Sequence, residues 1–433
     1  MKRDWSKRGK QATGLGVAVS GVVFALLVFL VGLGWGRAQE LPEVEARAAV
    51  LEEVSTGEVL VSQNPDELIA PASFTKVLTL YLVFEALERG NARLQDPVWV
   101  SEKAWRTGGS KMFIEVGKKV PLEELIKGIA VVSGNDACVA VAEHLYGSVD
   151  AFVEAMNRKA RELGMTRSHF ENPHGLPAEG QVTTARDMAT LARSYIQRFP
   201  QALQYHSMTE YTYNGITQPN RNRLLLKDSS VDGLKTGYVE SAGYHLAATA
   251  RRDGMRLLAV VMGAASPAVR EREAHKLLNY GFRRYVSVAP PDPSTPVKVV
   301  RVWKGTVDQV SLFPQAAHPI ILKKESAQGI RWESNAPDWV TAPIQENQVL
   351  GEALLKSGDT VLARINLVSR QEVPLGGFFK RLWHSVLQVR WTGWAHWGKA
   401  LAGVGAGAVV LLGAIGWIRA RGRRRKRGRW YLD

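Results

Sequence analysis

The sequence predicts a mixed α/β domain, a small all-β domain behind it, and an apolar segment near each end of the chain. Three observations lead to this prediction. Strand-like segments lie at both ends of residues 41–288, and helical patterns fill the part between them. A proline-rich stretch at 289–293 is followed by short segments in which apolar and polar residues alternate. Finally, each end of the chain combines an uncharged apolar run with a basic cluster.

The formal net charge of +15 lies mostly in the two ends of the 433-residue chain. Residues 1–10 hold five Lys and Arg and one Asp, and residues 419–433 hold eight and one, so the ends carry eleven of the fifteen charges. A nucleic-acid-binding domain carries its basic patch on a folded surface instead. Basic clusters beside apolar segments mark the cytoplasmic side of a membrane. The charge therefore indicates membrane topology, and no nucleic-acid partner is expected.

Residues 1–38 are predicted to be a signal peptide or an N-terminal anchor. An apolar run at 15–34 follows the basic start, and Gly36-Arg37-Ala38 is a small-x-small pattern that suits signal peptidase. The arginine inside this pattern is unusual, so both readings stay open. In either case the basic N-terminus remains in the cytoplasm and the next domain crosses the membrane.

The α/β domain is predicted over residues 41–288. Its sheet uses strands from both ends of this range, and a helical cluster is inserted between them. Pro71-Ala72-Ser73 opens an apolar helix that Gly90 stops. The other expected elements are strands at 47–54, 58–61, 233–236, 243–251 and 255–262, helices over 122–199 with a loop at 172–175, and a helix at 267–285.

Three further parts are predicted after the linker. Residues 295–375 form a small all-β domain without a recognisable catalytic set, which suits a spacer or binding module. Residues 377–397 are apolar at helical spacing and end in three tryptophans, as in an amphipathic helix on a membrane surface. Residues 400–418 are uncharged and just long enough to span a bilayer, which makes 419–433 a cytoplasmic tail. Membrane lipid is therefore an expected partner.

Three short motifs occur in order along the α/β domain. Ser73-Phe74-Thr75-Lys76 is the only SxxK, Ser133-Gly134-Asn135 is an SxN, and Lys235-Thr236-Gly237 is the only KTG. Each motif alone is a weak signal, since Ser62-Gln63-Asn64 is a second SxN that lies on the wrong side of Ser73. The specific signal is the ordered set, with the SxxK at a helix start and the KTG on a strand.

The spacing of the SxxK suits nucleophilic catalysis. Residues i and i+3 share one face of a helix, so Lys76 can reach the Ser73 hydroxyl and act as its general base. This requires a lowered Lys76 pKa, which burial and a second cation, Lys235, would provide. A helix start also favours the negative charge of a developing oxyanion near Ser73.

The other two motifs suit substrate binding and proton transfer. Lys235 and the Thr236 hydroxyl can bind a substrate carboxylate, and Gly237 lets the substrate lie against the strand as an added strand. Ser133 can relay a proton to the leaving amine, while Asn135 can hold the substrate amide.

This ordered triplet resembles that of penicillin-binding proteins and class A β-lactamases. The chain is most similar to the D-alanyl-D-alanine carboxypeptidase branch of the penicillin-binding proteins, over about residues 42–395. The resemblance implies a β-lactamase/transpeptidase-like fold, with an antiparallel sheet flanked by helices, and an oxyanion hole made by the Ser73 and Tyr238 backbone N–H groups. Tyr238, in place of a smaller or polar residue, and the spanning segment depart from the family pattern. Matching segments are 71–76, 133–138, 172–176, 184–188 and 232–237.

The resemblance implies a serine-type carboxypeptidase that removes the terminal D-alanine from peptidoglycan peptide stems through an acyl-Ser73 intermediate. β-Lactam antibiotics would then be acylating inhibitors. It places the enzyme at the cell membrane, with the catalytic domain outside the cytoplasm. The open alternatives are a β-lactamase, a DD-endopeptidase that cleaves cross-links, and a catalytically silent wall-binding scaffold.

No metal or cofactor is implied by the remaining residues. Cys138, the single cysteine, lies in an apolar run and is expected to be a buried side chain rather than a nucleophile. The histidines show no metal-ligand spacing. His174 could line the cleft, although a structural role in its loop is favoured.

Overall fold

The computed structural model describes residues 42–315 and 318–385. They form two compact units. One includes Val59–Arg251 and Leu257–Tyr280, and the other includes the short segments Glu53–Glu58 and Arg252–Arg256 together with the chain from Gly281 onward. The predicted segments at 1–38, 400–418 and 419–433 lie outside the described residues. Among the described residues, no helix has the length and apolar character that crossing a bilayer requires.

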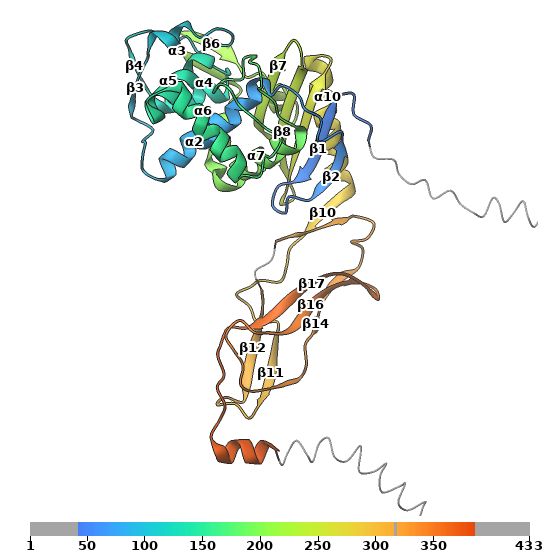
Figure 1. Cartoon of the computed structure of the whole chain (residues 1–433). Coiled ribbons are helices and arrows are strands. Elements are labelled where there is room, and N and C mark those ends of the chain that lie inside the picture. The colour runs from blue at the N-terminus through green and yellow to red at the C-terminus, as the bar shows by residue number, and fades with distance from the viewer. Residues whose placement is uncertain (1–41, 316–317, 386–433) are drawn as a thin grey trace, which may run out of the picture. The chain divides into compact units, whose positions relative to one another are not determined.

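The first unit contains a five-stranded sheet whose strands come from both ends of residues 41–288. Figure 1 shows the early strands β1 and β2 in blue beside the late, yellow-green strands β7 and β8. The pairs β1–β2 and β7–β8 are antiparallel, and β7 is an edge strand. The order is β2 (Val59–Gln63), β1 (Ala48–Glu53), β9 (Met255–Ala264), β8 (Gly243–Arg252) and β7 (Val231–Val239). The sheet location predicted from the sequence is confirmed.

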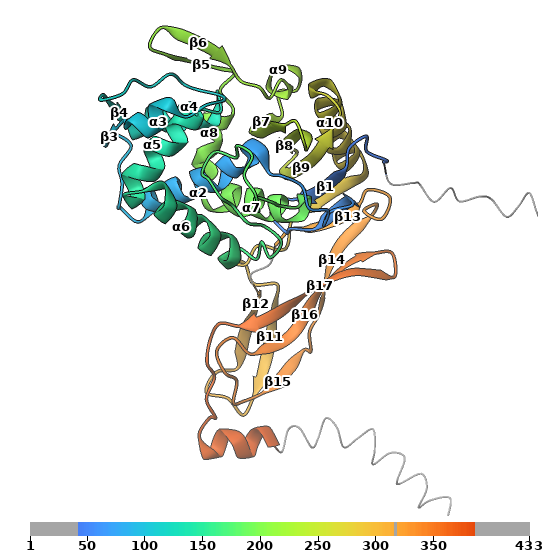
Figure 2. The same ribbon diagram turned by 45° about the horizontal axis from the view of Figure 1, so that its top comes forward.

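Helices cover both faces of this sheet. Helix α10 (Pro267–Arg284) lies on one face, and the inserted helical cluster lies on the other, as both ribbon views show (Figures 1 and 2). The centre of the cluster is α2 (Thr75–Glu88), which packs against the four helices α4 (Leu122–Ala130), α5 (Asn135–Tyr146), α6 (Val149–Glu162) and α7 (Ala185–Arg198). Every residue of α2 from Thr75 to Glu85 is buried. A helix surrounded in this way is apolar on all sides rather than amphipathic.

Polar residues determine where these helices begin and end. Ser148 accepts a hydrogen bond from Ala151 N at the start of α6, and Thr184 accepts one from Asp187 N at the start of α7. Gly147 adopts φ 77° at the end of α5, a conformation that glycine takes without strain. The smaller elements are η1 (Ala72–Phe74), β3 (Pro97–Trp99), α3 (Glu102–Arg106), β4 (Lys119–Pro121), η2 (Pro200–Ala202), α8 (Leu203–His206), β5 (Glu210–Tyr213), β6 (Ile216–Pro219) and α9 (Leu224–Lys227).

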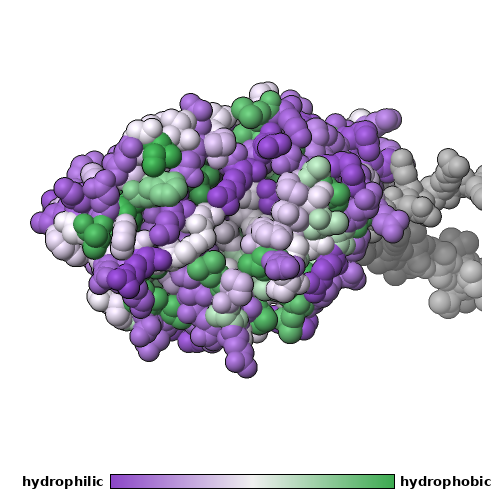
Figure 3. Space-filling model, turned by 90° about the horizontal axis from the view of Figure 1, so that it is seen from above, coloured by the Kyte–Doolittle hydropathy of each residue, from purple (hydrophilic) through white to green (hydrophobic). Residues whose placement is uncertain are grey.

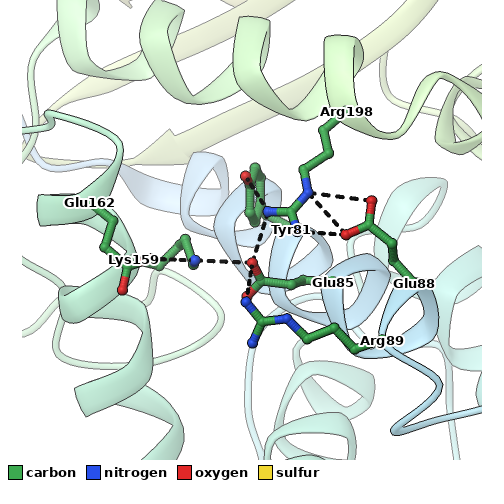
Figure 4. Close-up of polar contacts among 7 residues, drawn as sticks. All are labelled: Tyr81, Glu85, Glu88, Arg89, Lys159, Glu162 and Arg198. Carbon is green, nitrogen blue, oxygen red and sulfur yellow. Dashed lines mark hydrogen bonds and ion pairs between the residues drawn. The ribbon is translucent and has the colours of Figure 1, made fainter.

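A buried ion cluster ties α2 to its neighbours. The Glu85 carboxylate, with 6% of its side chain exposed, receives Lys159 Nζ of α6 at 3.0 Å and Arg198 Nη1 of α7 at 2.8 Å (Figure 4). Arg198 also binds Glu88 at 2.5 Å, and Arg89 approaches Glu85 to 3.1 Å. Such a cluster satisfies charges that would be costly to bury alone.

The face of the first unit that is seen from above is mostly hydrophilic (Figure 3). In the view from above, hydrophobic side chains lie in small separate patches among hydrophilic ones (Figure 3). Small dispersed patches of this kind are normal for a soluble folded unit.

The second unit is an all-β structure, as predicted. Its six-stranded sheet encloses a core that includes Val300, Val310, Leu312 and Leu367. The strand order is β14 (Ile330–Asn335), β16 (Val349–Ser357), β17 (Thr360–Ser369), β12 (Gln309–Pro314), β11 (Lys298–Trp303) and β15 (Trp339–Thr341). A separate antiparallel pair joins β13 (Ile320–Lys323) to β10 (Tyr285–Val288). The helix predicted at 267–285 therefore ends at Arg284, and residue 285 is the first residue of β10.

A helix begins at residue 378 and continues to the end of the described chain at 385. Lys380 pairs with Asp308 at 2.8 Å, and His384 Nδ1 accepts a hydrogen bond from Lys304 N at 2.8 Å. These contacts hold the helix on the β unit. Its large apolar side chains are exposed: Phe378, Phe379, Leu382 and Trp383.

Candidate active site

Ser73 lies in the short helix η1, directly before α2. Lys76, one turn later, is fully buried, and its Nζ donates to Ser73 Oγ at 3.0 Å and to the His174 carbonyl at 2.5 Å. Ala72 adopts φ 48°, which turns the chain sharply before the serine. The structure therefore brings the predicted nucleophile and base into direct contact.

The environment of Lys76 favours the neutral amine. Burial lowers the pKa of Lys76 to about 8, and the nearby Arg221 guanidinium acts in the same direction. A lysine with this pKa can accept a proton near neutral pH.

Ser133 and Asn135 lie at the start of α5. Ser133 adopts φ 63°, and its Oγ receives a hydrogen bond from Lys235 Nζ at 3.0 Å. Asn135 Nδ2 donates to the Gly108 carbonyl at 2.7 Å. The Oδ1 atom of Asn135 is the acceptor of this amide and can receive an N–H from a ligand.

The loop beside Asn135 is held by the neighbouring Asp136. This buried carboxylate accepts from Met112 N at 3.0 Å and from Phe113 N at 2.9 Å. Phe113 adopts φ 68°, so the backbone is kept in an unfavourable conformation by these bonds. The loop in turn brings Gly109 and Ser110 to the site.

Strand β7 brings the KTG motif opposite Ser73. Lys235 is buried, and burial together with repulsion from Lys76 and Arg221 holds the pKa of Lys235 well below its usual value. A Cβ on Gly237 would lie 3.3 Å from the Ala72 Cβ, so a larger residue would crowd the turn before the nucleophile. Two buried amines that repel each other suit a site that receives an anion.

These residues surround a cavity of about 390 Å³. The lining includes four predicted residues of the site besides Ser73 and Asn135: Ser133, Thr236, Gly237 and Tyr238. Arg221 and Arg270 also line it and add positive charge. No carboxylate is among the lining residues in the described part of the chain. The cavity thus combines a nucleophile with a cationic wall.

Sequence analysis missed both arginines. Each lies outside the three motifs, and a single arginine gives no local pattern from which to infer a site. Asp136 was also missed, although it directly follows the SxN. Its position at a helix start, beside a glycine-rich segment, was the available signal.

His174 both lines the cavity and stabilises its loop. Its Nδ1 accepts a hydrogen bond from Leu176 N at 3.2 Å, and its carbonyl accepts the bond from Lys76. Burial, aided by Lys76, lowers the pKa of His174 to about 3. The imidazole is therefore neutral at physiological pH.

Cys138 is buried, as predicted. Burial raises the pKa of the Cys138 thiol to about 12, so it is not a thiolate nucleophile. Within the described residues, no group of three or more His, Cys, Asp and Glu side chains is arranged to hold a metal ion.

Comparisons with known proteins agree with this geometry. Residues 36–266 match the family model of D-alanyl-D-alanine carboxypeptidases, and residues 289–375 match that of the penicillin-binding protein 5 C-terminal domain. The chain belongs to the D-alanyl-D-alanine carboxypeptidase family. It is 37% identical over 376 residues to D-alanyl-D-alanine carboxypeptidase DacC of Escherichia coli (strain K12), which covers 85% of this chain and 94% of that protein.

Solved structures of this family share the fold. Penicillin-binding protein 5 from Haemophilus influenzae has a TM-score of 0.70 and 35% identity, and the match covers 77% of this chain and 99% of that one. Penicillin-binding protein D2 from Listeria monocytogenes, in its ampicillin-bound form, has a TM-score of 0.52 and 29% identity over 56% of this chain and 100% of its own. The predicted family, the α/β fold with its all-β C-terminal domain, and the activity of a serine-type D-Ala-D-Ala carboxypeptidase are confirmed.

Proposed function

We propose that the chain removes the terminal D-alanine from peptidoglycan pentapeptide stems through an acyl-Ser73 intermediate. The observation that supports this most strongly is that three motifs far apart in the sequence converge. Lys76 donates to Ser73, Lys235 donates to Ser133, and Ser73, Ser133 and Thr236 line one cavity. A nucleophile in contact with a buried amine is the arrangement that acyl transfer requires.

In the acylation step, neutral Lys76 accepts the proton of the Ser73 hydroxyl while Oγ attacks the carbonyl carbon of the terminal peptide bond. The backbone N–H groups of Ser73 and Tyr238 stabilise the oxyanion. The C–N bond then breaks, and Ser133 passes its proton to the departing amine of D-alanine while it takes up the proton held by Lys76, which becomes neutral again. In deacylation, a water molecule gives a proton to neutral Lys76 and attacks the ester carbon. The ester bond to Ser73 then breaks, the proton returns from Lys76 to Ser73 Oγ, and the shortened stem leaves.

The cationic wall binds the carboxylate of the leaving residue. We assign Lys235 and the Thr236 hydroxyl as its ligands. Thr236 and Arg221 line the cavity, and Lys235 is buried behind Ser133, to which it donates. A bound carboxylate would also restore the charge of Lys235, because an anion close to a lysine raises its pKa. On the other side, Asn135 Oδ1 accepts an N–H of the stem, and Gly237 lets the stem approach strand β7 as an added strand.

β-Lactam antibiotics react at the same serine. Their strained amide and carboxylate fit the same groups as the terminal D-Ala-D-Ala, and the fold is similar to that of the ampicillin-bound Listeria protein. The acylated enzyme would accumulate if water reaches the ester slowly.

The enzyme acts outside the cytoplasm and remains at the cell membrane. Residues 1–38 direct export, 41–288 form the catalytic domain and 295–375 the β domain. The exposed apolar side chains of the helix from 378 support contact of 377–397 with lipid. Residues 400–418 then span the membrane, and 419–433 form a basic cytoplasmic tail.

Incubation with a synthetic pentapeptide stem, followed by mass spectrometry, tests the proposal. We expect loss of a single D-alanine from the wild type and none from Ser73→Ala. Rapid hydrolysis of penicillin without D-alanine release would favour a β-lactamase. Cleavage of cross-linked dimers without loss of the terminal residue would favour an endopeptidase, and full rescue of a deletion strain by Ser73→Ala would favour a scaffold.

A further inference from the structure

Tyr238, which directly follows the KTG motif, is part of an ordered aromatic stack. It lies opposite Tyr244 of β8 in the antiparallel register, and the two rings are 4.3 Å apart and inclined by 25°. Arg270 of α10 lies against the Tyr244 ring, and its guanidinium carbon is 5.6 Å from the centroid of that ring. The stack thus consists of Arg270, Tyr244 and Tyr238.

Hydrogen bonds fix the base of this stack. Arg270 is 6% exposed, and its Nη1 donates to the Gly237 carbonyl at 3.2 Å and to the His245 carbonyl at 3.4 Å. Gly237 and His245 are the residues next to Tyr238 and Tyr244 on their strands. The arginine therefore positions both strands and supports Tyr244, which in turn supports the Tyr238 ring.

The outer member of the stack faces the reaction cavity. Tyr238 lines this cavity, and half of its surface remains exposed. Residues i and i+2 of a strand point to the same face, and both Tyr238 and Thr236 line the cavity, so the ring is on the same side of β7 as the Thr236 hydroxyl. The ring is a rigid apolar surface beside the group that binds the substrate carboxylate.

The position of this ring limits one part of the substrate, given the proposed function. The leaving residue carries its carboxylate and its side chain on the same carbon atom. A carboxylate held at the Thr236 hydroxyl therefore brings that side chain to the part of the cavity that Tyr238 lines. A methyl group fits in a narrow space against an aromatic ring, whereas a long side chain collides with it unless the ring moves.

We infer that Tyr238 determines specificity for the leaving residue, restricting it to a small D-amino acid. Tyr244 and Arg270 are positioning residues that prevent the ring from moving aside. The inference rests on the proposed function and deepens it. It excludes stems whose leaving residue is a bulky diamino acid within a cross-link, and favours stems that end in free D-alanine.

Competing substrates test this inference. Two stems, one ending in D-Ala-D-Ala and one in D-Ala-D-Leu, are compared by kcat/KM for release of the last residue. We expect Tyr238→Ala to shift the ratio at least tenfold toward D-leucine, and Tyr238→Phe, which keeps the ring, to leave the ratio within twofold of the wild type. Neither change removes the backbone N–H of residue 238. Tyr244→Ala should shift the ratio in the same direction as Tyr238→Ala.

A second tyrosine stack provides the matched control. Tyr213 stacks on Tyr211 in the β5–β6 hairpin, with rings 6.4 Å apart, and does not line the cavity. Tyr213→Ala should leave the ratio unchanged. Should Tyr238→Ala fail to fold, Tyr238→Val, whose branched side chain suits a strand, replaces it.

The outcomes separate this inference from the function on which it rests. If the wild type releases no D-alanine, the proposed function fails. If the wild type releases D-alanine but both small variants at 238 keep its ratio, only the role of Tyr238 is overturned. An equal shift in Tyr213→Ala would overturn it as well, since the effect would then not come from the cavity.

Discussion

The Nζ atom of Lys76 lies 3.0 Å from Oγ of Ser73, and the lysine side chain is fully buried. The same burial that makes this lysine costly for the fold makes it useful as a base. A lysine in water holds its proton until far above neutral pH. Burial removes water from Lys76 and so lowers the pKa of the amine that must accept the serine proton.

Acylation should therefore depend on pH through Lys76. With its pKa at about 8, the neutral form increases as pH rises, so the rate should grow about tenfold per pH unit below that value and level off above it. His174, with its pKa of about 3, does not titrate in this range. The measurement is the rate of labelling by fluorescent penicillin from about pH 6 to about pH 9.5, a range that extends on both sides of this pKa. A rate that is flat across this range would contradict the role of Lys76, and Lys76→Met should not be labelled.

Ser133→Ala should slow release of D-alanine by about 100- to 10,000-fold, the usual contribution of a positioned proton-transfer group. The substitution removes the hydroxyl that Lys235 contacts at 3.0 Å. Alanine at φ 63° has about the same backbone strain as serine, so the strain does not change. Steady-state kinetics with a pentapeptide stem give the effect. An unchanged melting temperature is the control for folding, and a loss below threefold would exclude Ser133 as the relay.

Gly175→Ala should disrupt the nucleophile, although no chemical group is removed. A Cβ at this position would lie 1.8 Å from the carbonyl oxygen of Ala72, the residue before Ser73. We expect a loss of about 3 kcal/mol or more in unfolding free energy together with loss of penicillin labelling.

Gly147→Ala is the matched control for that substitution. Gly147 has a similar φ of 77°, but a Cβ there would meet nothing within 4 Å. It should cost about 1 kcal/mol of backbone strain and leave labelling intact. Equal losses in the two variants, measured by chemical denaturation, would show that strain rather than the collision with Ala72 is responsible.

Glu85→Gln should destabilise the helical cluster by about 3 kcal/mol, because it leaves Lys159 and Arg198 without their shared buried partner (Figure 4). Glu88→Gln removes a partner of the same Arg198, but Glu88 is 45% exposed, so about 1 kcal/mol or less is expected. Denaturant unfolding at about pH 7, where the carboxylates, Lys159 and Arg198 are all charged, gives both values. Equal effects would contradict the importance of burial.

The effect of Glu85→Gln should also depend on pH. Burial alone would raise the pKa of Glu85, but hydrogen bonds from Lys159 and Arg198 outweigh it and hold the pKa below its usual value. The charged carboxylate thus contributes its full stability above the ordinary pKa of a glutamate, and loses it as pH falls through the lowered value. The difference between wild type and variant should shrink in acid. A difference that stays constant down to acid unfolding would contradict this ion cluster.

Much of the site could be predicted because its chemistry is written in short motifs. Ser73 and Lys76 are close in sequence, and helix geometry brings them together in any context. That Lys235 would lie in the same site as Ser73 and Lys76 followed from the ordered motif set and the family resemblance, not from spacing alone, and its bond to Ser133 was not predicted. By contrast, Arg221 and Arg270 reach the cavity through tertiary packing, which no local pattern records.

The fold was predictable where hydrophobic periodicity is long. The strands at both ends of the catalytic range and the helix α10 were placed within a few residues. Short elements were not predicted: β3 and β4 have three residues each, too few to show a period. Residues 163–184 were read as mainly helical, but they are chiefly loops held by side chains such as Asn157, which binds both backbone groups of Phe170.

The insertion of the helical cluster between the outer strands has a consequence for biogenesis. Ser73 is synthesised early, yet its cavity needs β7, which follows more than a hundred and fifty residues later. A chain that stops before β7 would contain Ser73 and Lys76 but would lack Lys235 and Thr236, which we assign to binding the substrate carboxylate. Covalent labelling by a β-lactam antibiotic can therefore report that the domain has folded completely. It would distinguish the complete enzyme from a shorter fragment that contains the helices but lacks β7.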